Sequence, residues 1–169
     1  LYAQWEPEYT YTLAYNANGG INAPASSTVL NSSSTYSMTV SSSAPTRTGY
    51  TFAGWNTNSS GTGTNYSAGS SVSVGANATV MLYAKWTPVN YSITYNLDGG
   101  TATGNPTSYN IETATFTLNN PTKTGYTFTG WTGSNGSTAS TSVSIAKGST
   151  GNKNYTANWQ PVNYNITYT

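Results

Sequence analysis

Two stretches decide the fold: Tyr11-Thr-Leu-Ala-Tyr-Asn-Ala-Asn-Gly-Gly20 and Tyr91-Ser-Ile-Thr-Tyr-Asn-Leu-Asp-Gly-Gly100. In both, larger apolar side chains alternate with small or polar ones, which is the period of a β-strand with one buried face. Each stretch ends in two glycines, and glycine readily adopts the positive φ angles that tight turns require. The pattern predicts a strand and then a turn, with these turn glycines: Gly19, Gly20, Gly99 and Gly100.

Two further blocks recur in the same order. Pro45-Thr-Arg-Thr-Gly-Tyr-Thr-Phe-Ala-Gly-Trp55 recurs as Pro121-Thr-Lys-Thr-Gly-Tyr-Thr-Phe-Thr-Gly-Trp131. A closing block occurs three times, as Leu1-Tyr-Ala-Gln-Trp5, Leu82-Tyr-Ala-Lys-Trp86 and Asn154-Tyr-Thr-Ala-Asn-Trp159. A glycine just before a large ring is typical of a bulge that re-aims the side chain, so Trp55 and Trp131 are predicted to enter the core. The chain is therefore a set of tandem repeats.

The repeats divide the chain into four parts. We expect the closing strand of a preceding repeat at 1–5, modules at 9–86 and 91–159, and the opening strand of a following repeat at 164–169. Each joint between them contains a proline, at Pro7, Pro88 or Pro161, and proline makes a short connector fairly stiff. A beginning at a strand end, without an initiator Met, indicates an excerpt from a longer polypeptide.

The composition indicates folded modules with small aromatic cores. Charged residues make up 5% of the chain and aromatic residues 14%, whereas disordered chains have high net charge and few aromatic residues. No stretch has a helical period, so the fold is predicted to be all-β or β-rich, with small modules arranged like beads on a string. The predicted core signature is Tyr11, Tyr15, Tyr50, Phe52, Trp55, Trp86, Tyr91, Tyr95, Tyr126, Phe128, Trp131 and Trp159.

The same composition excludes several classes of function. The chain has no Cys, no His and only four carboxylates, which leaves no usual set of groups for a catalytic, cofactor or metal site. Its five basic residues lie far apart in the sequence, and nucleic-acid binding needs a basic patch. No apolar run approaches the length of a membrane span. We therefore predict no enzyme, no cofactor, no metal, no nucleic-acid partner and no membrane span.

The three blocks resemble the Listeria–Bacteroides repeat, also called the internalin-type B repeat. That family is marked by a Tyr-x-Ile/Leu-x-Tyr-Asn…Gly-Gly opening, a Gly-Tyr-Thr-Phe-x-Gly-Trp centre and a Tyr-Ala-x-Trp end, and the resemblance covers nearly the whole chain. It implies β-grasp-like modules along secreted or wall-attached bacterial surface proteins. It also implies a stalk or spacer role outside the cell, with neighbouring repeats of the same chain as partners and without catalytic residues.

Two other functions stay open at this point. Exposed aromatic rings can stack on sugars, so the chain is alternatively an adhesive or carbohydrate-binding module for surface glycans. The candidates for such a platform lie off the main pattern: Tyr36, Tyr66, Tyr83 and Tyr109. The second alternative is a self-assembling filament or sheath, in which residues 1–5 of one copy pair with residues 164–169 of another by strand addition.

Overall fold

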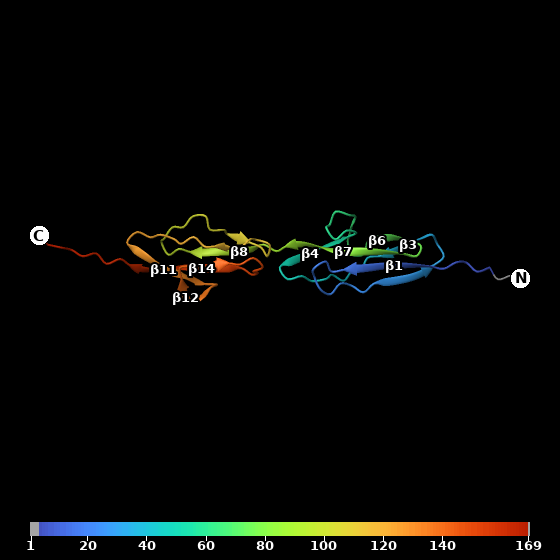
Figure 1. Ribbon diagram of the computed structural model, residues 1–169, viewed down its shortest axis with the longest axis horizontal. Helices are drawn as coiled ribbons and strands as arrows, with labels where there is room; N and C mark the ends of the chain where they lie inside the picture. The colour runs from blue at the N-terminus through green and yellow to red at the C-terminus, as the bar shows by residue number, and fades with distance from the viewer. Residues whose placement is uncertain (1–3, 169) are drawn as a thin grey trace. The chain divides into compact units, whose positions relative to one another are not determined.

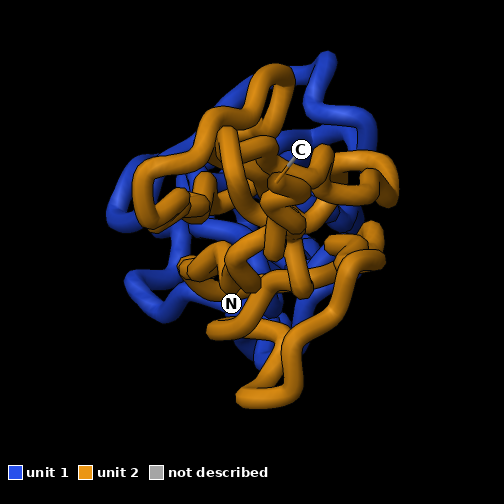
Figure 2. The backbone as a smooth tube through the Cα atoms, turned by 90° about the vertical axis from the view of Figure 1, so that its left-hand side faces the viewer, with its two compact units in different colours: residues 1–87 blue, residues 88–169 orange. Residues whose placement is uncertain are grey.

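The chain folds into β-strands connected by turns and loops, and the computed structural model describes residues 4–168 (Figure 1). No helix occurs among these residues, and so none that could cross a membrane. The chain separates into two compact units, Leu1–Thr87 and Pro88–Thr169, which Figure 2 colours differently. The prediction of an all-β fold is confirmed, whereas the more specific β-grasp assignment stays a prediction.

The first unit has a five-stranded sheet in the order β2-β1-β7-β4-β5 and a separate antiparallel pair, β3-β6. Strands β1 and β7 pair in parallel at the centre of the larger sheet, and β1 pairs with β2 antiparallel. The strand bounds are β1 Tyr9–Asn16, β2 Ser27–Asn31, β3 Thr35–Thr39, β4 Tyr50–Asn56, β5 Asn65–Tyr66, β6 Ser71–Gly75 and β7 Ala78–Pro88.

The core of the first unit lies between its two sheets. Alternation along β1 buries Tyr11 and Leu13, whereas Thr10 between the tyrosines faces solvent. The β3-β6 pair contributes Met38, Val72 and Val74 from the opposite side. The whole buried set is Tyr11, Leu13, Met38, Val40, Trp55, Val72, Val74, Leu82 and Ala84. The small sheet therefore covers the apolar face of the large one.

The second unit repeats this plan with strands of different length. Its five-stranded sheet has the order β12-β11-β14-β8-β9, and β8 and β14 pair in parallel at the positions of β1 and β7. A two-stranded pair, β10-β13, corresponds to β3-β6. The bounds are β8 Tyr91–Asn96, β9 Ser108–Tyr109, β10 Phe116–Thr117, β11 Tyr126–Gly133, β12 Gly136–Ser140, β13 Ser144–Ile145 and β14 Lys153–Pro161.

A glycine bulge turns one tryptophan into each core. Gly54 and Gly130 have φ angles of 102° and 134°, and the β11-β14 register shifts between Phe128 and Gly130. The tryptophan that follows is almost fully buried, with 1% of Trp55 and 0% of Trp131 exposed. The ring edges of Phe52 and Phe128 pack against these tryptophans at centroid distances of 5.1 and 5.4 Å.

Most of the other predicted core residues pack partly buried against a cluster, but Tyr126 does not. It is 41% exposed, contrary to the prediction, because it begins β11 at the edge of the core and lies under Lys123 instead. Tyr50, its counterpart, also lies outside the core cluster of its unit and is half-buried beneath Arg47. The residues packed partly buried are Tyr15, Phe52, Trp86, Tyr91, Tyr95, Phe128 and Trp159.

The two predicted end strands do not form within residues 4–168. Residues 1–3 and 169 lie outside the described residues, and Trp5 is 91% exposed. Residues 162–168 form no strand, and Tyr164, Ile166 and Tyr168 are 76%, 76% and 92% exposed.

The bulge glycine predicts a clear difference between two substitutions in one unit. A Cβ at Gly130 would lie 2.5 Å from the backbone nitrogen of Ser140, whereas a Cβ at Gly136, also at positive φ, meets nothing within 4 Å. Gly130→Ala should therefore lower the free energy of unfolding by about 2 kcal/mol more than Gly136→Ala. Denaturant unfolding followed by tryptophan fluorescence measures both, and equal losses would show that the close approach at Gly130 is unimportant.

Candidate functional site

The most elaborate side-chain arrangement recurs in both units around the glycine turn. We call it the closing cluster, and it comprises Gly19, Gly20, Arg47, Tyr50 and Trp86 in the first unit and Gly99, Gly100, Lys123, Tyr126 and Trp159 in the second. The turn follows the first strand of the unit, the cation and tyrosine precede or begin β4 or β11, and the tryptophan is on the last strand. Segments far apart in sequence therefore meet here.

The closing tryptophan is bonded to the turn. Trp86 Nε1 donates to the carbonyl oxygens of Ala17 and Asn18 at 3.0 and 3.1 Å, and Trp159 Nε1 donates to that of Leu97 at 3.0 Å. A Cβ at the second glycine would lie 2.5 Å from the Trp86 ring or 2.4 Å from the Trp159 ring. Only glycine allows the ring to approach the turn this closely, so the second glycine is required for space.

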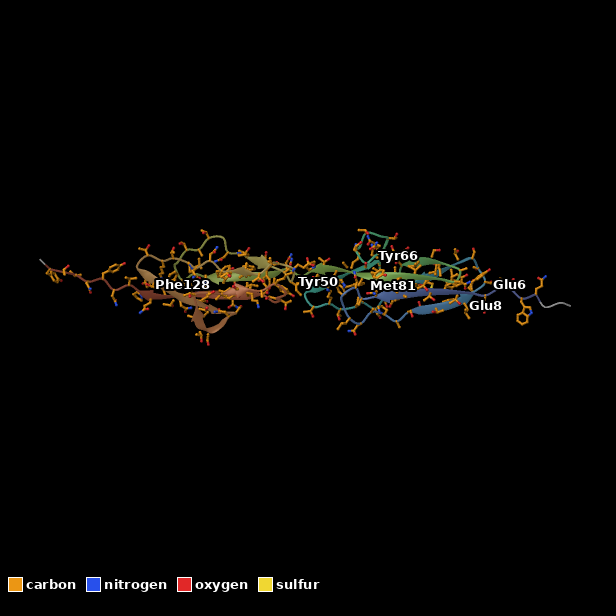
Figure 3. The ribbon with its side chains drawn as sticks, in the orientation of Figure 1. Glu6, Glu8, Tyr50, Tyr66, Met81 and Phe128 are labelled. Atoms are coloured by element: carbon orange, nitrogen blue, oxygen red, sulfur yellow. The ribbon has the colours of Figure 1, made fainter. Side chains whose placement is uncertain are left out.

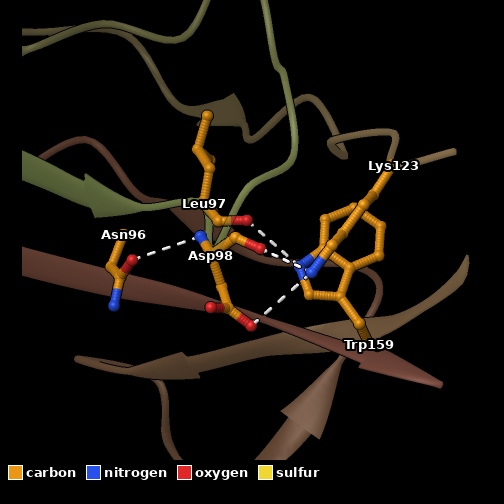
Figure 4. A network of polar contacts seen from close by, with 5 residues as sticks. All are labelled: Asn96, Leu97, Asp98, Lys123 and Trp159. Carbon is orange, nitrogen blue, oxygen red and sulfur yellow. Dashed lines mark hydrogen bonds and ion pairs between the residues drawn. The ribbon is translucent and has the colours of Figure 1, made fainter. Parts of the chain in front are cut away.

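A cation lies beside each turn, Arg47 in the first unit and Lys123 in the second, and Figure 4 shows the turn of the second unit. Lys123 Nζ donates to the carbonyl oxygen of Asp98 at 2.7 Å and lies 3.9 Å from its carboxylate. It also lies 4.2 Å from the ring centre of Tyr126 and 5.7 Å from that of Trp159. The Asp98 side chain is 68% exposed, so the ion pair contributes little, and the cation serves mainly to hold the ring and the turn together.

Tyrosine hydroxyl groups in partly buried positions act as tethers for loops. Tyr95 Oη donates to the Pro106 carbonyl at 2.8 Å, and Tyr109 Oη donates to the Gly151 carbonyl at 2.5 Å. Burial, and then the nearby Tyr155 hydroxyl, raises the pKa of Tyr95 to about 12, and burial also raises the pKa of Tyr109. These hydroxyl groups stay neutral at physiological pH and serve as hydrogen-bond donors.

The two core tryptophans differ in one hydrogen bond. Trp131 Nε1 donates to Asn120 Oδ1 at 3.1 Å, whereas the buried Nε1 of Trp55 has no partner within residues 4–168. In the recurring central block, Ala44 precedes Pro45 where Asn120 precedes Pro121. The missing amide explains the unsatisfied donor, and a buried unpaired donor costs stability.

The four tyrosines predicted as a sugar platform have different positions. Tyr109 is buried, contrary to the prediction, because β9 brings it beside Tyr91. Tyr36 and Tyr66 pack against the core of the first unit. Tyr83 is the exception: it is half-buried and lies outside that cluster, on the face of β7 opposite to Leu82 and Ala84.

A hollow of about 270 Å³ in the second unit is lined by Thr101, Ala102, Thr103, Asn119, Asn120 and Thr122, with no aromatic ring among them. The Nδ2 groups of Asn119 and Asn120 are already bonded to the Thr103 and Thr141 carbonyls. Residues 4–168 contain no group of three or more acidic, His or Cys side chains that could hold a metal ion. The arrangement as a whole is suited to holding strands together.

Comparison with known proteins gives a consistent result. The family model described as the Listeria-Bacteroides repeat domain matches residues 11–85 and 91–158. The chain is 33% identical over 132 residues to "Putative Gly-rich membrane protein" of Evansella cellulosilytica, which covers 78% of this chain and 15% of that protein. It is 38% identical over 88 residues to Internalin H of Listeria monocytogenes, which covers 52% of this chain and 15% of that protein. No solved structure matches.

The tryptophan asymmetry can be tested by exchanging the residue before the proline. Ala44→Asn should raise the free energy of unfolding of the first unit by about 1 kcal/mol, because it supplies an acceptor for Trp55 Nε1. Asn120→Ala should lower that of the second unit by about 1–3 kcal/mol, because it leaves Trp131 Nε1 unpaired and also removes the bond from Asn120 Nδ2 to Thr141. Ala44→Val adds volume but no acceptor and serves as the control. Denaturant unfolding is the measurement. If Ala44→Asn and Asn120→Ala both left the free energy of unfolding unchanged, the result would contradict the explanation.

Proposed function

The chain belongs to the Listeria-Bacteroides repeat domain family, and from that membership we propose that it is a non-catalytic spacer segment of an extracellular bacterial surface protein. The names of its relatives, an internalin and a membrane protein, support a location at the cell surface. The chain spans 15% of the length of each relative, so the proposal concerns this segment and not a whole protein.

The observation that carries the proposal is the repetition of a self-contained module. Each unit has its own buried cluster, built around its own tryptophan. Only Val89 and Asn90 separate the end of β7 from the beginning of β8, and Pro88 restricts the chain just before them. A short, proline-containing connection between complete modules suits a spacer better than a long flexible linker would.

We also propose that residues 164–168 are the opening strand of a further module. Pro161-Val-Asn-Tyr-Asn-Ile-Thr-Tyr168 differs from Pro88-Val-Asn-Tyr-Ser-Ile-Thr-Tyr95 at one position. Ile93 is buried, whereas its counterpart Ile166 is 76% exposed, so the segment lacks the cover that β8 has. A neighbouring repeat of the same polypeptide would supply that cover.

Pairing with the end of a second copy is a weaker explanation for the exposed segment. The core of a module also contains Trp55, Val72 and Val74, which come from strands between the first and the last. Two end segments joined across copies would lack these strands, and a two-stranded pair is marginally stable at best in water. The filament alternative therefore has less support than a following repeat.

Tyr83 favours carbohydrate binding by the first unit as a second candidate function. In the registers of the parallel strands, Tyr83 pairs with Asn16 and Thr156 pairs with Asn96, so Tyr83 and Thr156 are equivalent. Likewise Met81, labelled in Figure 3, is equivalent to Asn154. Its side chain is 37% exposed. The outer face of the first unit thus has a ring and an apolar neighbour where the second unit is polar, and this is a surface on which a neutral sugar ring could stack.

Restricted motion at the joint is the test of the spacer proposal. Spin labels on Thr79→Cys and Thr127→Cys, both exposed strand positions, report the distance between the units by pulsed electron resonance. The distribution should broaden when four glycines are inserted after Val89, because the insertion removes the stiffness of the joint. The same insertion after Ala25, in an exposed loop of the first unit, is the control and should change nothing. If the native distribution is already as broad as the first insertion gives, the spacer proposal fails.

The carbohydrate candidate predicts a different result. On a glycan array, binding by the chain should be abolished by Tyr83→Thr, which introduces the residue of the second unit. Tyr126→Thr changes an exposed tyrosine of the second unit and should leave binding unchanged. A native chain that binds no glycan would eliminate this candidate and leave the spacer proposal unaffected.

A further inference from the structure

We propose that each module is a mechanical clamp that resists tension applied between its two ends. The inference deepens the proposed spacer role, on which its biological use rests, because a spacer at a cell surface is pulled along its chain. It follows from the position and direction of the first and last strands of each module.

The two strands through which the chain enters and leaves a module are neighbours and run parallel. In the first unit Tyr11 to Asn16 pair with Ala78 to Tyr83, and in the second Ile93 to Asn96 pair with Lys153 to Thr156. The beginning of the first strand and the end of the last strand therefore lie at opposite ends of one ladder. Tension between them slides the strands along each other, so that the hydrogen bonds resist together and do not open one after another.

The last strand is enclosed on both sides. In the sheet orders, β7 lies between β1 and β4, and β14 lies between β8 and β11. The antiparallel register with β11 extends from Tyr126↔Pro161 to Gly133↔Tyr155, so it covers most of β14. Removing the last strand from its module would disrupt two ladders at once.

Side chains fasten the parallel ladder at its first end. In the first unit the backbone nitrogen of Thr10 donates to Asn77 Oδ1 at 3.0 Å, and in the second that of Ser92 donates to Asn152 Oδ1 at 3.0 Å. Each asparagine directly precedes the last strand, and each donor directly precedes the first paired residue of the first strand. We call these asparagines the clips, because each adds one hydrogen bond between the two strands beyond the first residue pair of the ladder.

The closing cluster fastens the other end. Trp86, near the end of β7, bonds to the carbonyl oxygens of Ala17 and Asn18, which directly follow β1. Trp159 on β14 bonds in the same way to Leu97, which directly follows β8. Both ends of the ladder are thus joined from the first strand to the last by side-chain hydrogen bonds, and the function of the closing cluster is to complete the clamp.

The two clamps have different lengths. Six residue pairs join β1 to β7 and five join β1 to β2, whereas four join β8 to β14 and two join β8 to β9. The position of the clip changes with the length of the ladder. In the first unit the clip is bonded to Thr10, whereas in the second it is bonded to Ser92, which lies two positions later in the repeat. The second unit should therefore yield at a lower force than the first.

The direction of pulling provides the decisive experiment. Because the chain has no cysteine, handles can be attached to introduced pairs in the full chain for single-molecule force measurements. Handles on the exposed pair Glu8→Cys and Thr87→Cys pull along the ladder of the first unit. Handles on Glu8→Cys and Gly75→Cys pull instead at one end of the ladder, where β1 and β7 begin, and separate the two strands from that end. The first pair should give a rupture force several-fold higher at the same loading rate. Equal forces, or a lower force along the ladder, would overturn the proposal.

The clips identify which unit gives which event when the whole chain is pulled by its ends. Asn152→Ala should lower only the weaker of the two rupture forces. Asn77→Gly, which removes the clip without strain at the positive φ of Asn77, should lower only the stronger. Asn58→Ala removes loop bonds to Ser60 that are outside the ladder, and it should leave both forces unchanged. Clip variants without effect, or with the reverse assignment, would contradict the clamp. Forces that depend on direction together with a freely moving joint would instead retain the clamp and reject the spacer.

Discussion

The structure of each module depends on the parallel pairing of its first and last strands. Parallel neighbours cannot be joined by a tight turn, because the chain must return to the starting end of the sheet before the second strand begins. In most proteins a helix makes that return. Here, within the described residues, strands and loops make it, and the β3-β6 or β10-β13 pair covers the apolar face of the sheet. A module is complete only when its last strand is in place.

That dependence explains the aromatic composition of the cores. A small module has few positions with which to fill the space between two thin layers, and large rings bury the most apolar area per residue. Trp55 and Trp131 reach the centre through a glycine bulge, and Trp86 and Trp159 reach the turn through a glycine that leaves room for the ring. The indole nitrogens then supply hydrogen bonds that aliphatic side chains could not. Aromatic residues therefore serve both packing and the connection between strands.

Alternation and glycine spacing predict the opening strands of the two modules, the turns that follow them and the inward tryptophans, because these features depend on local geometry. Residues 164–168 alternate in the same way and yet form no strand. Pairing is not local, so the sequence did not reveal the parallel register or the short edge strands. Tyr109 was expected at the surface because it lies off the main pattern, but the two-residue strand β9 places it in the core. Tyr126 belongs to a recurring block, yet it begins its strand beyond the edge of the cluster. Asn77 and Asn152 had no sequence signal, since an asparagine before a strand usually indicates only a turn.

The two modules also show which parts of the repeat can change without loss of the fold. The turn glycines, the bulge and the closing tryptophan are the same in both, because each is restricted by a positive φ angle or by a close contact. Positions without such a restriction differ, including Ala44 against Asn120, Tyr83 against Thr156 and the length of the ladder. Since these differences alter the stability of the core, the chemistry of the outer face and the resistance to tension, a repeat array can vary its properties module by module. Repetition then supplies one architecture with individually adjustable parts.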